Sequence, residues 1–217
     1  PMNTVFKFYY QAWILLALAS AYAIYRLLRV PGTAARWVLA ATGVLITFSL
    51  YYPLAATYSK ANGFQGEATL DGLAYVRRYQ PDEAAAIEWL RANVPAGSVV
   101  LEAKGDSYRP DTARVSAQTG LPTLLGWGWH EHQWRGNYRE PGRREPAIQQ
   151  IYTTASSEER QRLLQEFGVD YVFVGHTERE RYGLDAAAVA RLADGMNLVY
   201  GNGSVRIFQR RELFTVQ

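Results

Sequence analysis

This 217-residue sequence contains no cysteine. Its positive and negative charges nearly balance, with a formal net charge of only +3. The lack of cysteine excludes a cysteine nucleophile, and an exported domain of this size does not require disulfides. The positive charges are dispersed along the chain, so they indicate no nucleic-acid partner. Neither a G-x-S-x-G motif nor a phosphate-binding loop is present. The chain therefore carries no sequence signature of a serine hydrolase or a P-loop nucleotide-binding protein.

Charge of either sign is missing from two long stretches near the start of the sequence, residues 8–25 and 37–59. A helix that spans a bilayer needs about 20 mostly apolar residues. We therefore expect transmembrane helices at about residues 8–28 and 37–58, and membrane lipid as a partner. The alternative is a signal peptide followed by a buried core helix, but no small-residue cleavage site follows a short apolar core.

The connector between these two runs predicts their orientation. It contains Arg26, Arg29 and Arg36 and no acidic residue, and Pro31-Gly32 marks a turn. Positive connectors stay on the cytoplasmic side of a membrane. We therefore expect a multi-pass protein of the cell membrane whose chain after Lys60 is extracytoplasmic.

The rest of the chain alternates helical and strand patterns. Residues 1–60 form the predicted transmembrane hairpin, 61–80 a linker and 81–217 an extracytoplasmic α/β domain. Apolar spacing and capping residues predict helices at 81–94, from Glu145-Pro146 onward, after Ser156 and at 185–194. Strands are expected at 98–103, 121–125, 171–174 and on both sides of an Asn202-Gly203 hairpin. The predicted fold class is α/β, two transmembrane helices followed by a mixed sheet covered by helices.

The stretch LLGWGWHEHQWRG, residues 124–136, concentrates the chemistry of the chain. Gly126 and Gly128 predict a loop without regular structure at the end of a strand, where an α/β domain presents side chains to a ligand. Tryptophan faces suit sugar rings, and a guanidinium binds anionic oxygens. The alternative is an aromatic corner that only packs, with hydrogen-bonded histidines. The predicted substrate-binding residues are Trp127, His130, Glu131, His132, Trp134, Arg135, Glu102 and Arg114.

Other site chemistry is less well supported by the sequence. A zinc site needs three or four ligands, and His130 with His132 supplies two, so we expect neither a metal nor a cofactor. No residue is assigned a catalytic role. Arg139, Arg143 and Arg144 form a basic cluster, which is either a solvated face or one directed at lipid headgroups or a lipid-linked phosphate.

Several segments of the sequence resemble the C-terminal part of the YYY family of predicted integral membrane proteins. They are MNTVFKFYYQAW, TGLPTLLGWGWHEHQWRG, IYTT, GVDYVFVG and the ER-x-x-YG that follows it. One departure is Pro1, where the family pattern has arginine, which weakens any phosphate-binding role for that segment. The family is grouped with multi-spanning glycosyltransferases that use lipid-phosphate sugars.

The resemblance implies further transmembrane segments upstream of Pro1 and a catalytic carboxylate in an upstream extracytoplasmic loop, outside this chain. Its implied partner is a polyprenyl-phosphate-linked sugar. On this hypothesis the chain contributes substrate binding to a glycosyltransferase-like enzyme. The alternative is a non-catalytic extracytoplasmic module of the cell envelope that binds a ligand or acts as a scaffold.

Overall fold

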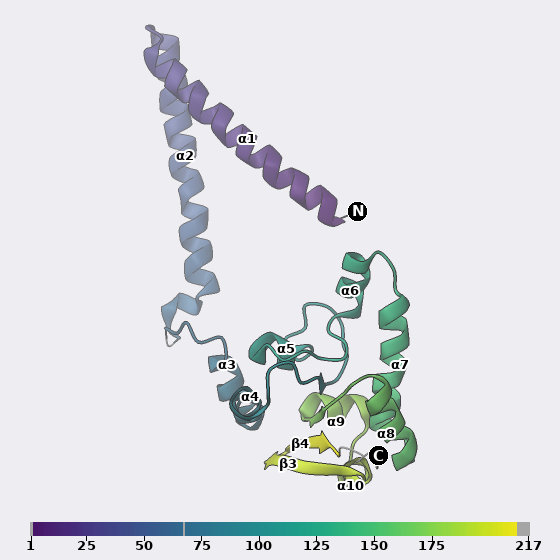
Figure 1. Ribbon diagram of the computed structural model, residues 1–217. Helices are drawn as coiled ribbons and strands as arrows, with labels where there is room; N and C mark the ends of the chain where they lie inside the picture. The colour runs from purple at the N-terminus through teal and green to yellow at the C-terminus, as the bar shows by residue number, and fades with distance from the viewer. Residues whose placement is uncertain (1, 67, 212–217) are drawn as a thin grey trace. The chain divides into compact units, whose positions relative to one another are not determined.

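The computed structural model describes residues 2–66 and 68–211 (Figure 1). The chain divides into two compact units, Pro1–Ala68 and Thr69–Gln217, which we call the N-terminal and C-terminal units. Each has its own internal contacts, and each is described by itself below.

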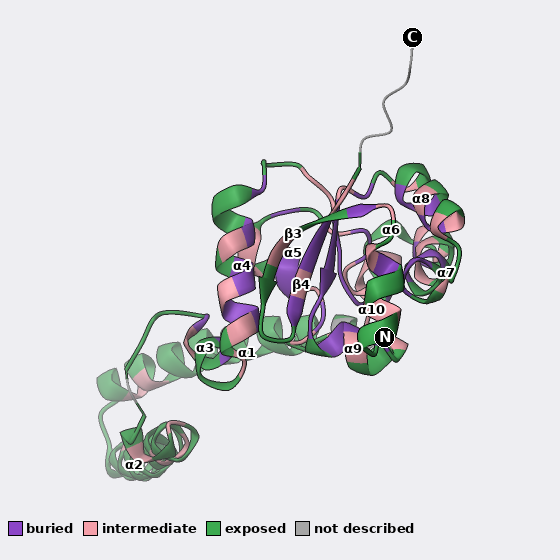
Figure 2. Cartoon of the chain, turned by 90° about the horizontal axis from the view of Figure 1, so that it is seen from below, coloured by how far each residue is buried: buried purple, intermediate pink, exposed green. Residues whose placement is uncertain are grey.

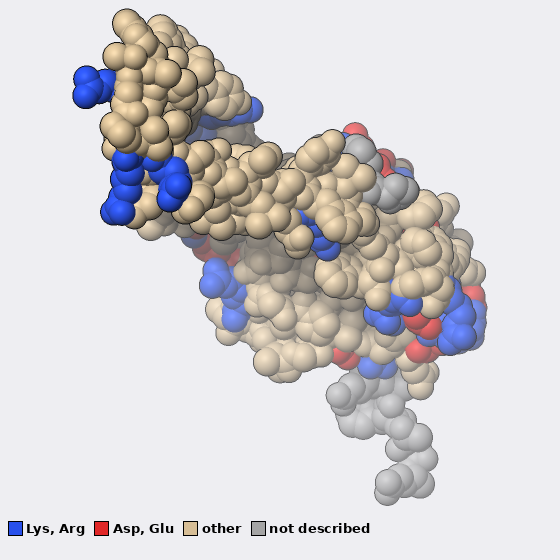
Figure 3. Space-filling model, turned by 90° about the horizontal axis from the view of Figure 1, so that it is seen from above, with Lys and Arg blue, Asp and Glu red and all other residues tan. Residues whose placement is uncertain are grey.

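The N-terminal unit contains two long helices, α1 (Met2–Arg29) and α2 (Thr33–Lys60), followed by the short 3₁₀ helix η1 (Asn62–Phe64). Both long helices are long and apolar enough to cross a membrane, and their apolar side chains are exposed along most of their length. In Figure 3 these helices are tan over most of their length, with blue near their ends. Such surfaces need lipid rather than water around them, which indicates that the chain associates with a membrane.

Hydroxyl side chains inside α2 are compatible with that environment. Thr42 donates to the carbonyl of Val38 at 2.8 Å, and Thr47 donates to the carbonyl of Gly43 at 2.9 Å. These bonds satisfy the hydroxyl groups within the helix itself, as lipid surroundings require.

The C-terminal unit is built on a four-stranded mixed sheet in the order β1-β2-β4-β3. Strand β1 (Val100–Leu101) is parallel to β2 (Tyr171–Val174), while β2 and β3 (Met196–Asn202) are both antiparallel to β4 (Val205–Arg210). The predicted fold class is therefore confirmed. The strand predicted at 121–125 is wrong, because this segment forms only an isolated bridge between Thr123 and Val100.

Helices cover both faces of this sheet (Figure 2). Because side chains alternate along a strand, Tyr171 and Phe173 of β2 pack on the side of α4 (Pro81–Asn93), while Val172 and Val174 face the opposite core. That second core is closed by three helices, α7 (Arg139–Thr153), α8 (Ser157–Glu166) and α10 (Ala186–Ala193).

Local signals place several of these helices as the sequence predicts. Ser156 caps the start of α8, because its hydroxyl accepts a hydrogen bond from the amide of Glu159 at 3.1 Å. Gly168, after the end of the helix, has a φ of 62°. Helix α7 begins at Arg139, earlier than the predicted start at Glu145, and accommodates Pro146 in its interior.

The carboxyl ends of the parallel strands β1 and β2 position the polar residues of the unit. Glu102 directly follows β1, and Gly175 follows β2 and precedes α9 (His176–Tyr182). The chain after β1 then forms α5 (Arg114–Thr119) and α6 (Gly128–Arg135), while α3 (Ala74–Tyr79) precedes α4. Helix α6 stands at the end of the unit opposite the β3–β4 hairpin (Figure 1).

Candidate functional site

The histidine- and tryptophan-rich stretch is a helix, so the loop predicted there is wrong. The carbonyl of Trp127 accepts the amide of Glu131 at 3.0 Å, and Gly136 ends the helix with a φ of 75°. Gly128 is therefore the first residue of α6 rather than a helix breaker, and the glycine with left-handed backbone lies just after the helix. Helical spacing then decides which of the predicted site residues lie together.

One face of α6 lines a cleft of about 450 Å³. Residues at the spacing i, i+3, i+4, i+7 and i+8 share a helix face, and the five that line the cleft have this spacing from position 127. The opposite wall comes from Ala113 and from Ser116 and Ala117 of α5. We call this the α6 cleft, and its residues from the predicted set are Trp127, His130, Glu131, Trp134 and Arg135.

The aromatic wall of the α6 cleft is held by contacts from the preceding loop. The indole nitrogen of Trp127 donates to the Thr112 hydroxyl at 3.2 Å, and the ring of His130 lies 5.2 Å from that of Trp127. The exposed ring of Tyr108 packs against both, at 5.6 Å from Trp127 and 4.8 Å from His130. The Nδ1 atom of His130 lies 2.8 Å from the hydroxyl of Ser107. Trp127 and His130 are therefore oriented before any ligand binds.

The two charged residues of the cleft, Glu131 and Arg135, form a solvent-accessible ion pair. The Oε2 atom of Glu131 lies 3.3 Å from Nε of Arg135, and its Oε1 atom accepts the amide of Gly126 at 3.2 Å. The Arg135 side chain is 48% exposed, and within residues 2–66 and 68–211 its two terminal Nη groups make no hydrogen bond. These groups are the free donors that the cleft offers to an anionic ligand.

His132 lies outside the α6 cleft. Its ring contacts Trp129 and Tyr138 at 5.7 Å each, on another side of α6, and its buried Nδ1 atom has no hydrogen-bond partner among the described residues. His130 and His132 thus face different directions, as residues two apart in a helix must. The described part of the chain holds no group of three histidine, aspartate or glutamate side chains placed to bind a metal ion.

Glu102 and Arg114 do not line the cleft either, because both are buried inside the unit. The guanidinium of Arg114 binds Glu178 at 2.7 Å, Glu83 at 3.0 Å and Glu102 at 3.5 Å. All four side chains are at most 3% exposed. We call these four residues the buried charge cluster.

Backbone amides complete this cluster. Glu178 accepts the amides of Ala103 and Gly175 at 2.7 and 2.8 Å, and Glu102 accepts the amide of Val115 at 3.2 Å to each oxygen. A side chain at Gly175 would collide with the Glu83 carboxylate and the Phe173 ring. The cluster thus joins α4, α5 and α9 to the end of β1, and it is architectural.

Burial raises the pKa of Glu102 to about 7, against the opposing effect of the neighbouring Arg114. Glu102 is also the cluster carboxylate with the longest contact to the guanidinium. Three carboxylates and one arginine would leave net negative charge in the interior, so a proton on Glu102 reduces the cost of burial.

Sequence reasoning missed two sets of residues. Ser107, Tyr108 and Thr112 hold the aromatic wall, and only tertiary structure brings them to α6. Glu83 and Glu178 complete the buried charge cluster from positions far apart in the chain. The spacing of the five cleft residues was a helical signal already present in the sequence.

The chain was compared with family models, curated proteins and solved structures. No family model and no curated protein matches the chain, so the resemblance to the YYY family stays a prediction. Among solved structures, the chain is similar to the C-terminal globular domain of an oligosaccharyltransferase from Archaeoglobus fulgidus. The two are 12% identical with a TM-score of 0.38, over 67% of this chain and 100% of that domain.

Proposed function

We propose that this chain is the substrate-binding C-terminal part of a multi-spanning, glycosyltransferase-like membrane protein. In this proposal the α6 cleft binds the sugar-phosphate portion of a polyprenyl-phosphate-linked sugar. The observation that carries the proposal is the cleft itself, where one helix face places two tryptophans beside a half-exposed arginine and a glutamate.

The chemistry of the cleft suits a ligand with a ring and an anionic group. The indole faces of Trp127 and Trp134 offer apolar surface to sugar C–H groups, and the free Nη groups of Arg135 offer two donors to a phosphate. Glu131 can accept a sugar hydroxyl while it stays paired with Arg135. A cleft of about 450 Å³ lies within the range of about 300–1,000 Å³ that is usual for small-molecule sites.

The catalytic base is assigned to an upstream part of the protein. The resemblance to the YYY family implies a catalytic carboxylate in an upstream loop, and Glu131, which lines the cleft, is paired with Arg135. This supports a binding role for the chain. The arginines at the ends of α1 and α2 favour a cytoplasmic connector, and therefore an extracytoplasmic cleft.

The second candidate is a non-catalytic extracytoplasmic module of the cell envelope that binds a ligand or acts as a scaffold. The ion pair between Glu131 and Arg135 favours this second candidate, because the cleft then offers groups that bind a ligand but no activated nucleophile. The two candidates differ in whether sugar transfer depends on the cleft.

The test is sugar transfer from polyprenyl-phosphate glucose or mannose by the full-length protein in membranes. The variant is Arg135→Lys, which keeps the charge but removes the planar fork of donors. We expect transfer to fall about tenfold, as the loss of one charge-assisted hydrogen bond implies. The matched control is Arg162→Lys, an exposed arginine that is also paired with glutamates of its own helix, on α8.

Three outcomes separate the candidates. Reduced transfer in Arg135→Lys alone supports the transferase proposal. Binding of the lipid-linked sugar that depends on Arg135, without transfer, supports the non-catalytic module. Equal binding and transfer in wild type, Arg135→Lys and Arg162→Lys would overturn both.

A further inference from the structure

Helix α6 exposes a large aromatic side chain near each of its two ends. Trp129 is 65% exposed and Trp134 is 84% exposed, on a helix of only eight residues. The chain from Gln133 to Asn137 is exposed at every position. Tryptophan so far out of a core is typical of a surface that meets a partner, and its amphipathic ring is favoured at membrane interfaces.

Exposed arginines follow these tryptophans along the chain. Arg135 and Arg139 are exposed where α6 ends and α7 begins, and the Arg143 side chain one turn further is 58% exposed. The acidic residues of the same surface, Glu131 and Glu140, are each paired with an arginine. The remaining donors complement phosphate groups, which arginine binds through its planar fork.

This surface lies close to a bilayer because α6 and the membrane helices α1 and α2 belong to the same chain. Helix α2 ends at Lys60 and α3 begins at Ala74, so 13 residues, 61–73, connect the membrane helices to the C-terminal unit. Part of this segment is folded, because Asn62–Phe64 form η1 and the Leu73 side chain is buried. The segment is therefore short and keeps the C-terminal unit near the membrane surface, where the chemistry of its exposed faces decides which face contacts lipid.

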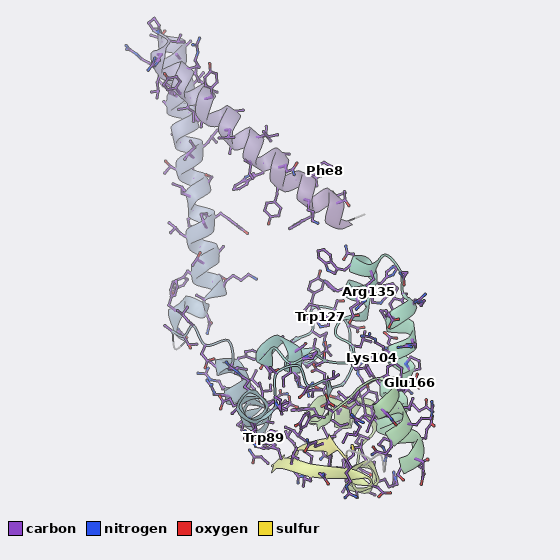
Figure 4. All side chains as sticks on the ribbon, viewed as in Figure 1. Phe8, Trp89, Lys104, Trp127, Arg135 and Glu166 are labelled. Carbon is purple, nitrogen blue, oxygen red and sulfur yellow. The ribbon has the colours of Figure 1, made fainter. Side chains whose placement is uncertain are left out.

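We propose that the α6 tip, defined as Trp129, Gln133, Trp134, Arg135 and Arg139, inserts into the headgroup region of the membrane that α1 and α2 span. Trp129 and Trp134 enter the interface, and Arg135 and Arg139 bind lipid phosphates. Figure 4 shows Trp127 and Arg135 at the α6 end of the unit, with Trp89 of α4 at the opposite end. The docking face is thus one end of the unit, and the β3–β4 hairpin points away from lipid. Trp134 and Arg135 also line the α6 cleft. The vesicle test below contains no polyprenyl-phosphate sugar, so it tests lipid contact separately from the proposed function.

The absence of cysteine makes a direct test practical. The full chain is prepared with one cysteine, either Gln133→Cys on the α6 tip or Leu198→Cys on β3, and labelled with an environment-sensitive fluorophore. Leu198 is a matched position because it is also exposed, at 57%, but lies on the hairpin. Both proteins are reconstituted in phosphatidylcholine vesicles with and without phosphatidylglycerol, and quenching by lipids spin-labelled near the headgroup is measured.

The expected result is quenching at position 133 that exceeds quenching at position 198 by about threefold or more, with a further increase when phosphatidylglycerol is present. Replacing both exposed tryptophans, Trp129→Ser with Trp134→Ser, should reduce quenching at position 133 by about half or more. The control is Tyr79→Ser, which removes a ring that is 76% exposed on α3, and should leave it unchanged.

A second variant keeps the test valid if the double tryptophan substitution unfolds the C-terminal unit. Arg139→Glu should lower quenching at position 133 only in vesicles that contain phosphatidylglycerol, because it reverses one charge and leaves the aromatic rings in place. Equal quenching at positions 133 and 198, stronger quenching at 198, or no response to either set of substitutions would overturn the proposal.

Discussion

Two groups of charged residues lie within the C-terminal unit, and they differ in almost every physical respect. In the buried charge cluster, Arg114 is 3% exposed and is surrounded by three carboxylates from different elements. In the α6 cleft, Arg135 is 48% exposed and pairs with one carboxylate four residues away in the same helix. The first arginine has no donor left for a ligand, and the second has most of its donors free. Burial, rather than residue type, therefore separates the residue that holds the fold from the residue that can bind a ligand.

The largest expected effect comes from removing the positive charge inside the buried charge cluster. Arg114→Met leaves the carboxylates of Glu83, Glu102 and Glu178 without their partner, and unpaired buried charge is strongly destabilising. We expect the free energy of unfolding to fall by about 3–5 kcal/mol. Thermal unfolding of the full chain in detergent measures this. Arg162→Met, at an exposed arginine, should change the stability little, and a similar loss in both variants would remove the contrast drawn here.

A pH-dependent effect of intermediate size is expected at Glu102. Because its pKa is about 7 when folded and 4.5 when unperturbed, the folded chain binds this proton more tightly. Its contribution to stability is therefore full below about pH 4.5 and is lost as the pH rises through about 7. The loss is about 3 kcal/mol at most.

Glu102→Gln isolates this contribution, since the amide mimics the protonated carboxyl group. The variant should unfold at a higher temperature than wild type at pH 8 and at a similar temperature at pH 5. Glu166→Gln, at an exposed position of α8, is the control. If Glu102→Gln and wild type lose stability in parallel between pH 5 and pH 8, the proton is held elsewhere.

The smallest effect on stability is expected in the α6 cleft. Arg135→Gln removes an exposed ion pair, and such pairs contribute less than about 1 kcal/mol. We expect a change in unfolding free energy below about 0.5 kcal/mol, measured by thermal unfolding as for Arg114→Met. A loss comparable to that of Arg114→Met would show that Arg135 holds the fold after all.

Much of the fold is predictable because it depends on neighbouring residues. The run Tyr171–Val174 is apolar and β-branched or aromatic throughout, and it forms β2. Ser156 and Gly168 bound α8 through capping that acts within a few residues. Helix α6 is the exception, because Gly126 and Gly128 suggest a loop from the sequence, whereas of these two and Gly136 it is Gly136 that has the left-handed backbone.

The grouping of the charged residues could not be predicted in the same way. Glu102 and Arg114 follow a strand that leads toward the candidate site, so sequence order suggests that they join the cleft. Their burial depends on Glu83 and Glu178, which reach them from distant parts of the chain. No local sequence pattern predicts this burial, because the four side chains come together only when β1 and β2 pair.

The span of the buried charge cluster along the chain also bears on how the protein is made. Glu83 and Glu178 are roughly 95 residues apart, and at about 5–20 residues per second a ribosome needs about 5 to 20 s to synthesise the segment between them. For the last 64 residues of that segment, about 3 to 13 s, Arg114 has been synthesised but its closest partner, Glu178, has not. The C-terminal unit therefore waits in an unfinished state, with polar groups that only water or a chaperone can satisfy. Chains that stop before residue 178 would never leave that state, and they are natural targets for proteolysis.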